Sequence, residues 1–358
     1  MKNLEMIKEM TLAHGPSGFE GEIKNLIKKH LRGKAEFDQD NLGSLICKKS
    51  GTQTAPKIMI PGHMDEVGFM VNSITKNGFI KFVPLGGWWD QVLLAQKVTI
   101  KTSRGDLVGI IGSTPPHLLS AKDRKEVVEK KTMFIDVGAK DRGEAQEVLG
   151  IQPGDPIIPS SSFQVLNGTK MVMSKAIDNR LGCCLFMDLI ASLEKHDHPN
   201  TVFGVGTVQE EVGLRGAATA TNMIEPDICL VVDVTIATDT PGLEKEDSEV
   251  KLGAGPVLTL VDASMIGNRG LRDLVINTAK ENSIPLQFNT MMGGGTDGGA
   301  IHKIGPGVPT VVISFPTRYI HSHYSIFHYD DYDFALQLFI SLTKKLDLGT
   351  VNKIKQGF

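Results

Sequence analysis

This sequence of 358 residues has few cysteines, no large excess of charge of one sign and no long apolar run. The four cysteines, Cys47, Cys183, Cys184 and Cys229, form no Cys-x-x-Cys pattern, which predicts reduced thiols rather than a disulfide framework. Lys and Arg number 38 against 41 for Asp and Glu, and no long basic run occurs, so we expect no nucleic-acid partner. No stretch reaches the roughly 18 apolar residues of a membrane span, so we expect no membrane partner either.

Several familiar targeting and catalytic signals are also missing. The first 20 residues contain no uninterrupted apolar segment of the signal-peptide kind, which together with the reduced thiols predicts a cytoplasmic protein. Neither His-Glu-x-x-His nor Gly-x-Ser-x-Gly occurs. The sequence therefore gives no support for the zinc proteases marked by the first motif or the serine hydrolases marked by the second. The glycine-rich stretch 292–299 contains Gly-x-Gly-x-x-Gly but lacks the acidic residue expected about 20 positions further on. We interpret it as a turn or a substrate-lining loop rather than a dinucleotide site.

The apolar residues that are present follow recognisable periods. Two N-terminal segments carry them at helical spacing and are separated by Gly15-Pro16-Ser17-Gly18, which predicts two helices. Near-continuous apolar runs, typical of buried strands, occupy 57–60, 201–208, 227–232 and 309–315. Helical spacing recurs over 181–193, 271–278 and 334–342. This alternation predicts an α/β fold, with a central, mostly parallel mixed sheet flanked by helices.

The stretch from about residue 68 to residue 165 has a different character. It contains short alternating strands with turn signals at Asn77-Gly78 and Arg104-Gly105-Asp106, and a single helical candidate at 121–130. At about 150 residues per domain, the chain length favours two or three domains. We therefore predict a main domain formed by 1–67 plus 166–358, into which a small, β-barrel-like domain at 68–165 is inserted.

Two short motifs at the ends of predicted elements could carry chemistry. His63 and Asp65 follow the first apolar strand of the main domain, and ligands in open α/β sheets gather at such strand ends. His63 could bind a metal ion while Asp65 orients its ring, although a solvated turn with a capping aspartate would also explain the pair. Asp178 stands immediately before a predicted helix, where it is either the helix N-cap or a ligand.

Three further strand ends carry acidic residues or histidine. Glu210 and Glu211 close one apolar strand, and adjacent carboxylates repel each other unless cations or a raised pKa relieve them. Asp233 ends a second strand, where it lies at a solvated edge or binds a cation. His321 follows a third strand. Two neighbouring histidines are expected on the surface: His323 and His328.

Side chains at the carboxyl ends of these strands should meet at one edge of the sheet. Five of them provide three ligands for each of two metal ions if Asp178 bridges, the others being His63, Asp233, Glu211 and His321. Nitrogen and oxygen ligands without cysteine suit Zn, Co or Mn. Glu210, next to a ligand, is then the candidate general base for a water shared by the two ions. The sequence thus predicts a dinuclear hydrolytic site with two divalent ions per subunit.

Six motifs in order along the chain resemble the tetrahedral, or deblocking, aminopeptidases, a family of dinuclear metallopeptidases that includes glutamyl aminopeptidases. The motifs are GPSG at 15–18, PGHMDEVG at 61–68, AIDNR at 176–180, VQEEVGLRGA at 208–217, GGTD at 294–297 and RYIHS at 318–322. Pro-Pro-His-Leu at 115–118 in the predicted insertion also fits the pattern, so the resemblance covers nearly the whole chain.

The resemblance implies a zinc-peptidase-like catalytic domain and an inserted domain that dimerises. Similar proteins often build tetrahedra of twelve subunits in the cytoplasm, so we expect a homo-oligomer based on dimers, with a tetrahedral dodecamer as its larger form. For the site, the resemblance implies His63, Asp178 and Asp233 on the first metal, Asp178, Glu211 and His321 on the second, Glu210 as base, and Asp65 behind His63.

The activity implied is removal of N-terminal amino acids from peptides with a free N-terminus, by water that two metals and a glutamate base activate. A related two-metal deacylase or carboxypeptidase is the nearest alternative, because the metal site does not say which end of the substrate is held. Glu210 and Asp65 could also form the carboxylate pair of an endoglucanase, although two adjacent tryptophans, Trp88 and Trp89, make a poor platform for sugars. A self-assembling, peptide-binding shell is the non-enzymatic alternative. The sequence leaves the preferred N-terminal residue open.

Overall fold

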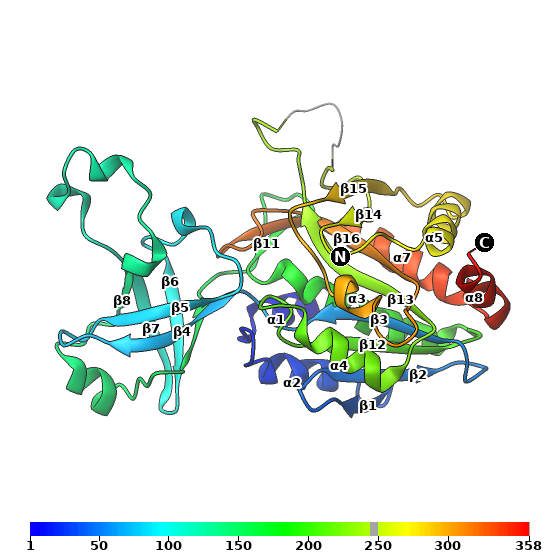
Figure 1. Cartoon of the computed structure of the whole chain (residues 1–358), viewed down its shortest axis with the longest axis horizontal. Helices are drawn as coiled ribbons and strands as arrows, with labels where there is room; N and C mark the ends of the chain where they lie inside the picture. Colours follow the sequence, from blue (N-terminus) through cyan, green and yellow to red (C-terminus); the bar gives the residue numbers. More distant parts are fainter. Residues whose placement is uncertain (244–249, 358) are drawn as a thin grey trace.

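The computed structural model describes residues 1–243 and 250–357 and divides them between an eleven-stranded sheet with its helices and a separate, closed six-stranded barrel (Figure 1). Both parts agree with the predicted fold class, which is thereby confirmed. The four strands at the centre of the large sheet run parallel, and the strands outside them pair mainly antiparallel.

The strands of the large sheet do not pair in chain order. From one edge to the other they are β1 (Glu36–Gln39), β2 (Leu45–Ser50), β12 (Thr201–Thr207), β3 (Lys57–His63), β13 (Ile228–Ile236), β16 (Thr310–Arg318), β17 (Ser325–His328), β11 (Met171–Ser174) and β10 (Gln164–Val165). Two further strands branch from β16, namely β14 (Val257–Asp262) and, beyond it, β15 (Gln287–Met291). The predicted strands thus form the parallel centre β12-β3-β13-β16.

The central strands are apolar along their whole length because both faces of the sheet are covered. On β3, Ile58 and Ile60 belong to the apolar core on one face, whereas Met59 belongs to the core on the other. Neighbouring β13 divides in the same way, with Val232 on the first face and Val231 on the second. Alternate side chains of a strand point to opposite faces, so a strand that is buried twice needs apolar residues at every position.

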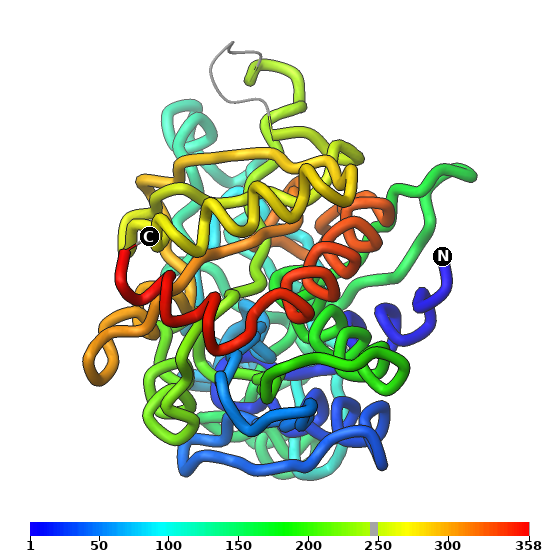
Figure 2. Tube along the Cα trace, turned by 90° about the vertical axis from the view of Figure 1, so that its right-hand side faces the viewer, coloured from blue at the N-terminus to red at the C-terminus, as the bar shows by residue number. Residues whose placement is uncertain are grey.

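Six helices pack against the first face or against one another beside it, and two short helices cover the second. Figure 2, seen from the end opposite the barrel, shows the last helices of this group lying side by side. Among the described residues no helix is both long and apolar enough to cross a bilayer. The helices are α1 (Leu4–Leu12), α2 (Gly21–His30), α3 (Ile177–Ser192), α5 (Arg269–Glu281), α7 (Tyr329–Lys345) and α8 (Leu348–Lys355) on the first face, with α4 (Arg215–Ile224) and α6 (Gly298–Ile301) on the second.

The barrel is antiparallel throughout and encloses an apolar core of its own. Around the barrel its strands are β4 (Gly68–Ile74), β5 (Ile80–Leu85), β8 (Phe134–Asp136), β7 (Gly105–Gly112), β6 (Lys97–Thr102) and β9 (Pro156–Pro159). Short helical turns lie between them or follow α3: η1 (Asp90–Val92), η2 (Pro116–Leu118), η3 (Asp123–Lys125), η4 (Lys130–Thr132), η5 (Glu144–Val148) and η6 (Leu193–Lys195).

The helix predicted at 121–130 is wrong. Only the single turns η3 and η4 form in this part of the barrel domain, and neither of them buries a residue. A short charged segment without an apolar face to bury gains too little from packing to offset the cost of starting a helix. The predicted domain limits, 68 and 165, stay a prediction, and β10, inside that range, pairs with β11 of the large sheet.

One close contact fixes the distance between α3 and the sheet. A methyl group on Gly62 of β3 would lie 2.7 Å from the carbonyl carbon of Gly182 and 2.9 Å from the amide nitrogen of Cys183. Glycine is therefore required at this position because backbone meets backbone. The contact also sets where α3 presents its first turn next to the end of β3.

We expect Gly62→Ala to lower the free energy of unfolding by about 1–3 kcal/mol, because the added methyl group forces α3 away from the sheet. Urea unfolding followed by circular dichroism measures the change. Gly21→Ala is the matched control, since Gly21 begins α2 and a methyl group there meets no atom within 4 Å. Equal stability of the two variants would contradict this account of the contact.

Candidate metal centre

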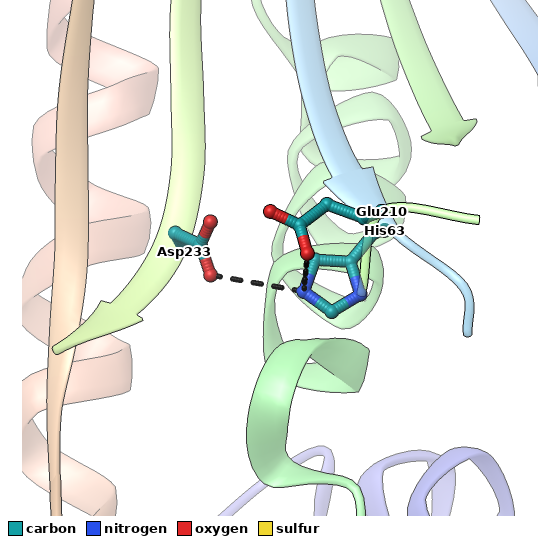
Figure 3. A group of neighbouring side chains, drawn as sticks. All are labelled: His63, Glu210 and Asp233. Atoms are coloured by element: carbon teal, nitrogen blue, oxygen red, sulfur yellow. Dashed lines mark ion pairs between the residues drawn. The ribbon is translucent and has the colours of Figure 1, made fainter. Parts of the chain in front are cut away.

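The structure gathers all seven predicted site residues at the carboxyl end of the parallel strands. His63 is the last residue of β3 and pairs with Thr207, the last residue of β12. Glu210 lies shortly after β12, and Asp233 lies on β13, the other neighbour of β3 (Figure 3). Because β13 continues to Ile236, the prediction that Asp233 ends its strand is wrong. The other four are Asp65 after β3, Asp178 in the first turn of α3, Glu211, and His321 after β16.

Three carboxylates surround one nitrogen of His63. Its Nε2 atom lies 3.0 Å from Asp178 Oδ1, 3.8 Å from Glu210 Oε2 and 3.9 Å from Asp233 Oδ1. Figure 3 shows the side chains of Glu210 and Asp233 turned toward the His63 ring, with Asp233 on a strand beside that of His63. Ligand atoms of these three residues lie within 4.8 Å of one another, and so do those of a second group formed by His63, Asp178 and Glu211.

Asp178 lies between the two predicted halves of the site. Its second oxygen, Oδ2, is 3.3 Å from His321 Nε2, and the same nitrogen is 3.3 Å from Glu211 Oε2. Asp178 does not cap α3, because the side chain that accepts a hydrogen bond from the first turn of the regular helix is that of Asn179, from the Gly182 amide at 3.1 Å. The alternative interpretation as a helix N-cap is therefore wrong, and the carboxylate faces one histidine with each oxygen.

Asp65 is completely buried and holds the site together from behind. Its carboxylate accepts hydrogen bonds from the backbone amides of Glu210, at 3.0 Å, and Glu211, at 3.1 Å. A third hydrogen bond comes from the Ser17 hydroxyl, at 2.6 Å. His63 Nδ1 lies 3.1 Å from the backbone oxygen of Asp65 and 3.6 Å from its carboxylate. A proton on Nδ1 is donated to the backbone oxygen, and Nε2, which faces the three carboxylates, can then bind a cation.

The barrel forms one wall of the site. A methyl group on Gly87, which follows β5, would lie 3.2 Å from His321 Nδ1, and one on Gly86 would lie 3.3 Å from Glu211 Oε2. The next residue, Trp88, packs against His323 with ring centroids 5.6 Å apart. His323 is only 2% exposed, so the prediction that it lies on the surface is wrong. The sequence does not reveal that the barrel turn covers it.

A cavity of about 1280 Å³ opens onto these residues. Its walls come from the turn after β5, from β13, from the glycine-rich loop at 293–296 and from the segment 319–324 after β16. The glycine-rich loop thus lines the same cavity as the candidate ligands, as one of its two interpretations predicted. Such a concave, largely apolar space beside clustered ionisable groups is typical of a substrate site.

The M42 glutamyl aminopeptidase family matches residues 43–338 of this chain. The chain belongs to that family. The glutamyl aminopeptidase of Lactococcus lactis subsp. cremoris (strain MG1363) is 36% identical over 360 residues, which cover 99% of this chain and 99% of that protein. These findings confirm the resemblance found in the sequence, and with it the prediction of an enzyme that hydrolyses peptide bonds.

Two solved structures share the fold of this M42 chain closely. The TET aminopeptidase from the marine sediment archaeon Thaumarchaeota archaeon SCGC AB-539-E09 is 46% identical, covers 99% of both chains and superposes with a TM-score of 0.96. The TET1 peptidase of Pyrococcus horikoshii is 33% identical, covers 96% of this chain and 99% of that one, and has a TM-score of 0.86. That peptidase can assemble into a tetrahedron or a large octahedral shell.

Burial, and to a lesser degree mutual repulsion, disfavours the charged forms of the acidic groups of this M42 site. Burial, with the nearby Asp178 charge, raises the pKa of Glu211 to about 8, and burial with Asp178 likewise raises the pKa of Asp233 to about 8. Burial raises the pKa of Glu210 well above its usual value, and the Asp233 charge adds to this effect against the opposing one of His63. Burial disfavours the charged form of Asp178 too, but hydrogen bonds with His321 and His63 hold its pKa well below the usual range.

These properties test whether the donor set fits divalent cations. The set offers histidine nitrogens and carboxylate oxygens, which suit Zn, Co or Mn. Glu211 Oε1 is buried and has no hydrogen-bond partner among the described residues, so one carboxylate oxygen still needs a cation or a proton. Members of this family depend on metal, and the residues present fit that requirement.

Sequence reasoning missed the groups that support the site. Glu66 accepts hydrogen bonds from Lys175, at 2.6 and 2.7 Å, and from Arg180, at 3.3 Å, all three being buried. Arg180 also donates to the backbone oxygen of Gly15, which places the segment that carries Ser17. All of these residues lie in or next to the quoted motifs, but no spacing in the sequence relates residue 17 to residue 65 or residue 66 to residue 180.

Removal of divalent ions should make the stability of the protein fall as the pH rises from about 5 to 8. Glu211 and Asp233 have folded-state pKa values of about 8, above their ordinary values of 4.5 and 3.8, so the folded protein binds more protons than the unfolded one in this range. The stabilisation is complete below the unfolded pKa values and is lost as the pH rises through about 8, on the order of several kcal/mol. Thermal unfolding of chelator-treated and metal-loaded protein at each pH measures it.

The control for this pH dependence is the double variant Glu211→Gln/Asp233→Asn, which no longer carries the two titrating groups. Its chelated form should lose most of the dependence. If the chelated wild-type protein were as stable at pH 8 as at pH 5, the crowding of charges described above would be refuted.

Proposed function

We propose that this M42 chain is a dinuclear metalloaminopeptidase that removes N-terminal amino acids from peptides with a free N-terminus. The observation that carries the proposal is the position of Asp178, whose two oxygens face His63 and His321 from between them. A carboxylate in that position can bridge two cations. Membership in the glutamyl aminopeptidase family supports the same reaction.

Each ion would have three ligands in this proposal. His63, Asp178 and Asp233 would hold the first, and Asp178, Glu211 and His321 the second, with Zn, Co or Mn as the metal. When bound, the two ions would polarise the scissile carbonyl and lower the pKa of the attacking water. Asp65 positions this set, because it holds the His63 ring and both glutamate amides.

Glu210 is the general base in this mechanism. Its carboxylate lines the cavity, and its nearest basic group is His63 at 3.8 Å, whereas Glu211 is already paired with His321 at 3.3 Å. Burial raises the pKa of Glu210, which improves its ability to accept a proton from water near neutral pH. Glu210 takes that proton during attack on the carbonyl and delivers it to the nitrogen of the leaving amine.

In this proposal the barrel domain mediates assembly of the subunits into an oligomer. The barrel exposes apolar side chains, among them Val108, Ile110, Leu118 and Val148, which supports a role of 68–165 in dimerisation. Because the TET1 peptidase of Pyrococcus horikoshii can assemble into a tetrahedron, we propose a homo-oligomer built from dimers, with a tetrahedral dodecamer as the complete form. The four cysteines are free and buried, which supports a cytoplasmic location.

Glu210→Gln should keep its metal but lose activity by about 10² to 10⁴ in kcat, because the amide cannot accept the proton of the water. Metal analysis of the purified variant, together with steady-state kinetics on an aminoacyl amide, separates the two effects. Glu5→Gln is the control, since Glu5 is exposed on α1 and does not line the cavity. An active Glu210→Gln enzyme would remove Glu210 from the role of base.

Free and acetylated aminoacyl amides distinguish an aminopeptidase from a deacylase or carboxypeptidase. We expect cleavage of the free-amine substrates alone, its loss on chelation, and its recovery with Zn, Co or Mn, because a free amine can be anchored at the metal centre and an acetylated nitrogen cannot. Cleavage of acetylated substrates, or release of C-terminal residues from a peptide, would replace this proposal with one of the two alternatives.

A further inference from the structure

The cavity beside the candidate metal centre has walls that are mainly apolar. The barrel supplies Trp88, Trp89 and Val92, and β13 supplies Val234 and Ile236. The segment after β16 adds two tyrosines and an isoleucine to these walls. With a volume of about 1280 Å³, the cavity has room for the side chains of more than one substrate residue.

Charged groups in these walls are confined to the metal centre. Among the described residues that line the cavity, the acidic ones are Asp178, Glu210, Glu211 and Asp233, and all belong to the candidate centre. The same lining contains neither lysine nor arginine. Of its histidines, two are candidate ligands and the third, His323, is packed against the Trp88 ring.

This distribution decides which substrate side chains are favourable. A glutamate side chain in the cavity would lose its hydration without gaining a lysine or arginine partner from the described walls. A lysine side chain would find acidic partners only in groups that the metal ions require. A leucine, methionine or phenylalanine side chain gains apolar contacts and leaves no charge unpaired.

We propose that this cavity selects peptides whose N-terminal side chain is large and uncharged, such as that of Leu, Met or Phe, over those that begin with Glu or Lys. The proposal rests on the proposed aminopeptidase function and adds the substrate class to it. It sets this chain apart from its Lactococcus lactis relative, whose name specifies a glutamyl substrate.

The first test compares kcat/KM of the metal-loaded, full-length enzyme for the p-nitroanilides of Leu, Met, Glu and Lys. We expect the Leu and Met substrates to exceed the Glu and Lys substrates by at least about tenfold. Equal or better cleavage of the Glu or Lys substrate would overturn the preference but leave the aminopeptidase function intact. Failure to cleave all four would instead refute the proposed function on which the preference rests.

The second test places a cation in the wall. Ile236→Lys, on β13, and Trp89→Lys, on the barrel, change residues that are 51% and 63% exposed, so both variants should fold. We expect at least one of them to raise the ratio of Glu to Leu cleavage by about fivefold or more, since it supplies the missing partner. Ile266→Lys is the matched control, because Ile266 is 78% exposed and does not line this cavity.

A shift with either wall variant, and none with Ile266→Lys, would support the proposal. An unchanged ratio in both wall variants, with unfolding temperatures equal to that of the wild type, would overturn it. A shift of the same size with Ile266→Lys would also overturn it, because the cause would then be the net charge of the protein rather than the cavity.

Discussion

Repulsion among buried carboxylates is the constraint on which the rest of this structure depends. Four acidic side chains lie in contact with or near His63 and His321, and the arrangement is favourable only when protons or cations neutralise it. Four parallel strands and the first turn of α3 deliver these acidic groups and the two histidines to one edge of the sheet. The fold therefore supplies apolar packing on both faces of the sheet to offset the cost of a charged cluster at its end.

Hydrogen bonds to Asp65 fix the positions of the residues in this acidic cluster. The carboxylate fixes two neighbouring backbone amides, so Glu210 and Glu211 point in different directions although they are adjacent in sequence. Glu210 faces His63 and Glu211 faces His321, which suits their proposed roles as base and ligand. The buried group of Glu66, Lys175 and Arg180 then fixes the N-terminal segment, whose Ser17 completes the partners of Asp65.

Much of this could be predicted from sequence because the signals are local. Continuous apolar runs located the four parallel strands, and polar residues at their ends identified the candidate ligands, since parallel strands share a carboxyl edge. The helix predicted at 121–130 failed because charge alternation resembles helical spacing but offers nothing to bury. The contacts of Ser17 and the burial of His323 could not be predicted, because each depends on a distant segment whose approach is fixed only by the folded chain.

The turn at Gly86 and Gly87 makes the barrel one wall of the candidate metal centre. No methyl group fits comfortably between this turn and His321 or Glu211, so the two folded units meet at van der Waals distance at a candidate ligand. Without this turn, one side of the candidate metal centre would be open to solvent. The barrel and the sheet domain therefore constrain each other. A change in the turn at Gly86 and Gly87 would move Glu211 or His321, and a change at either of those residues would have to fit the turn.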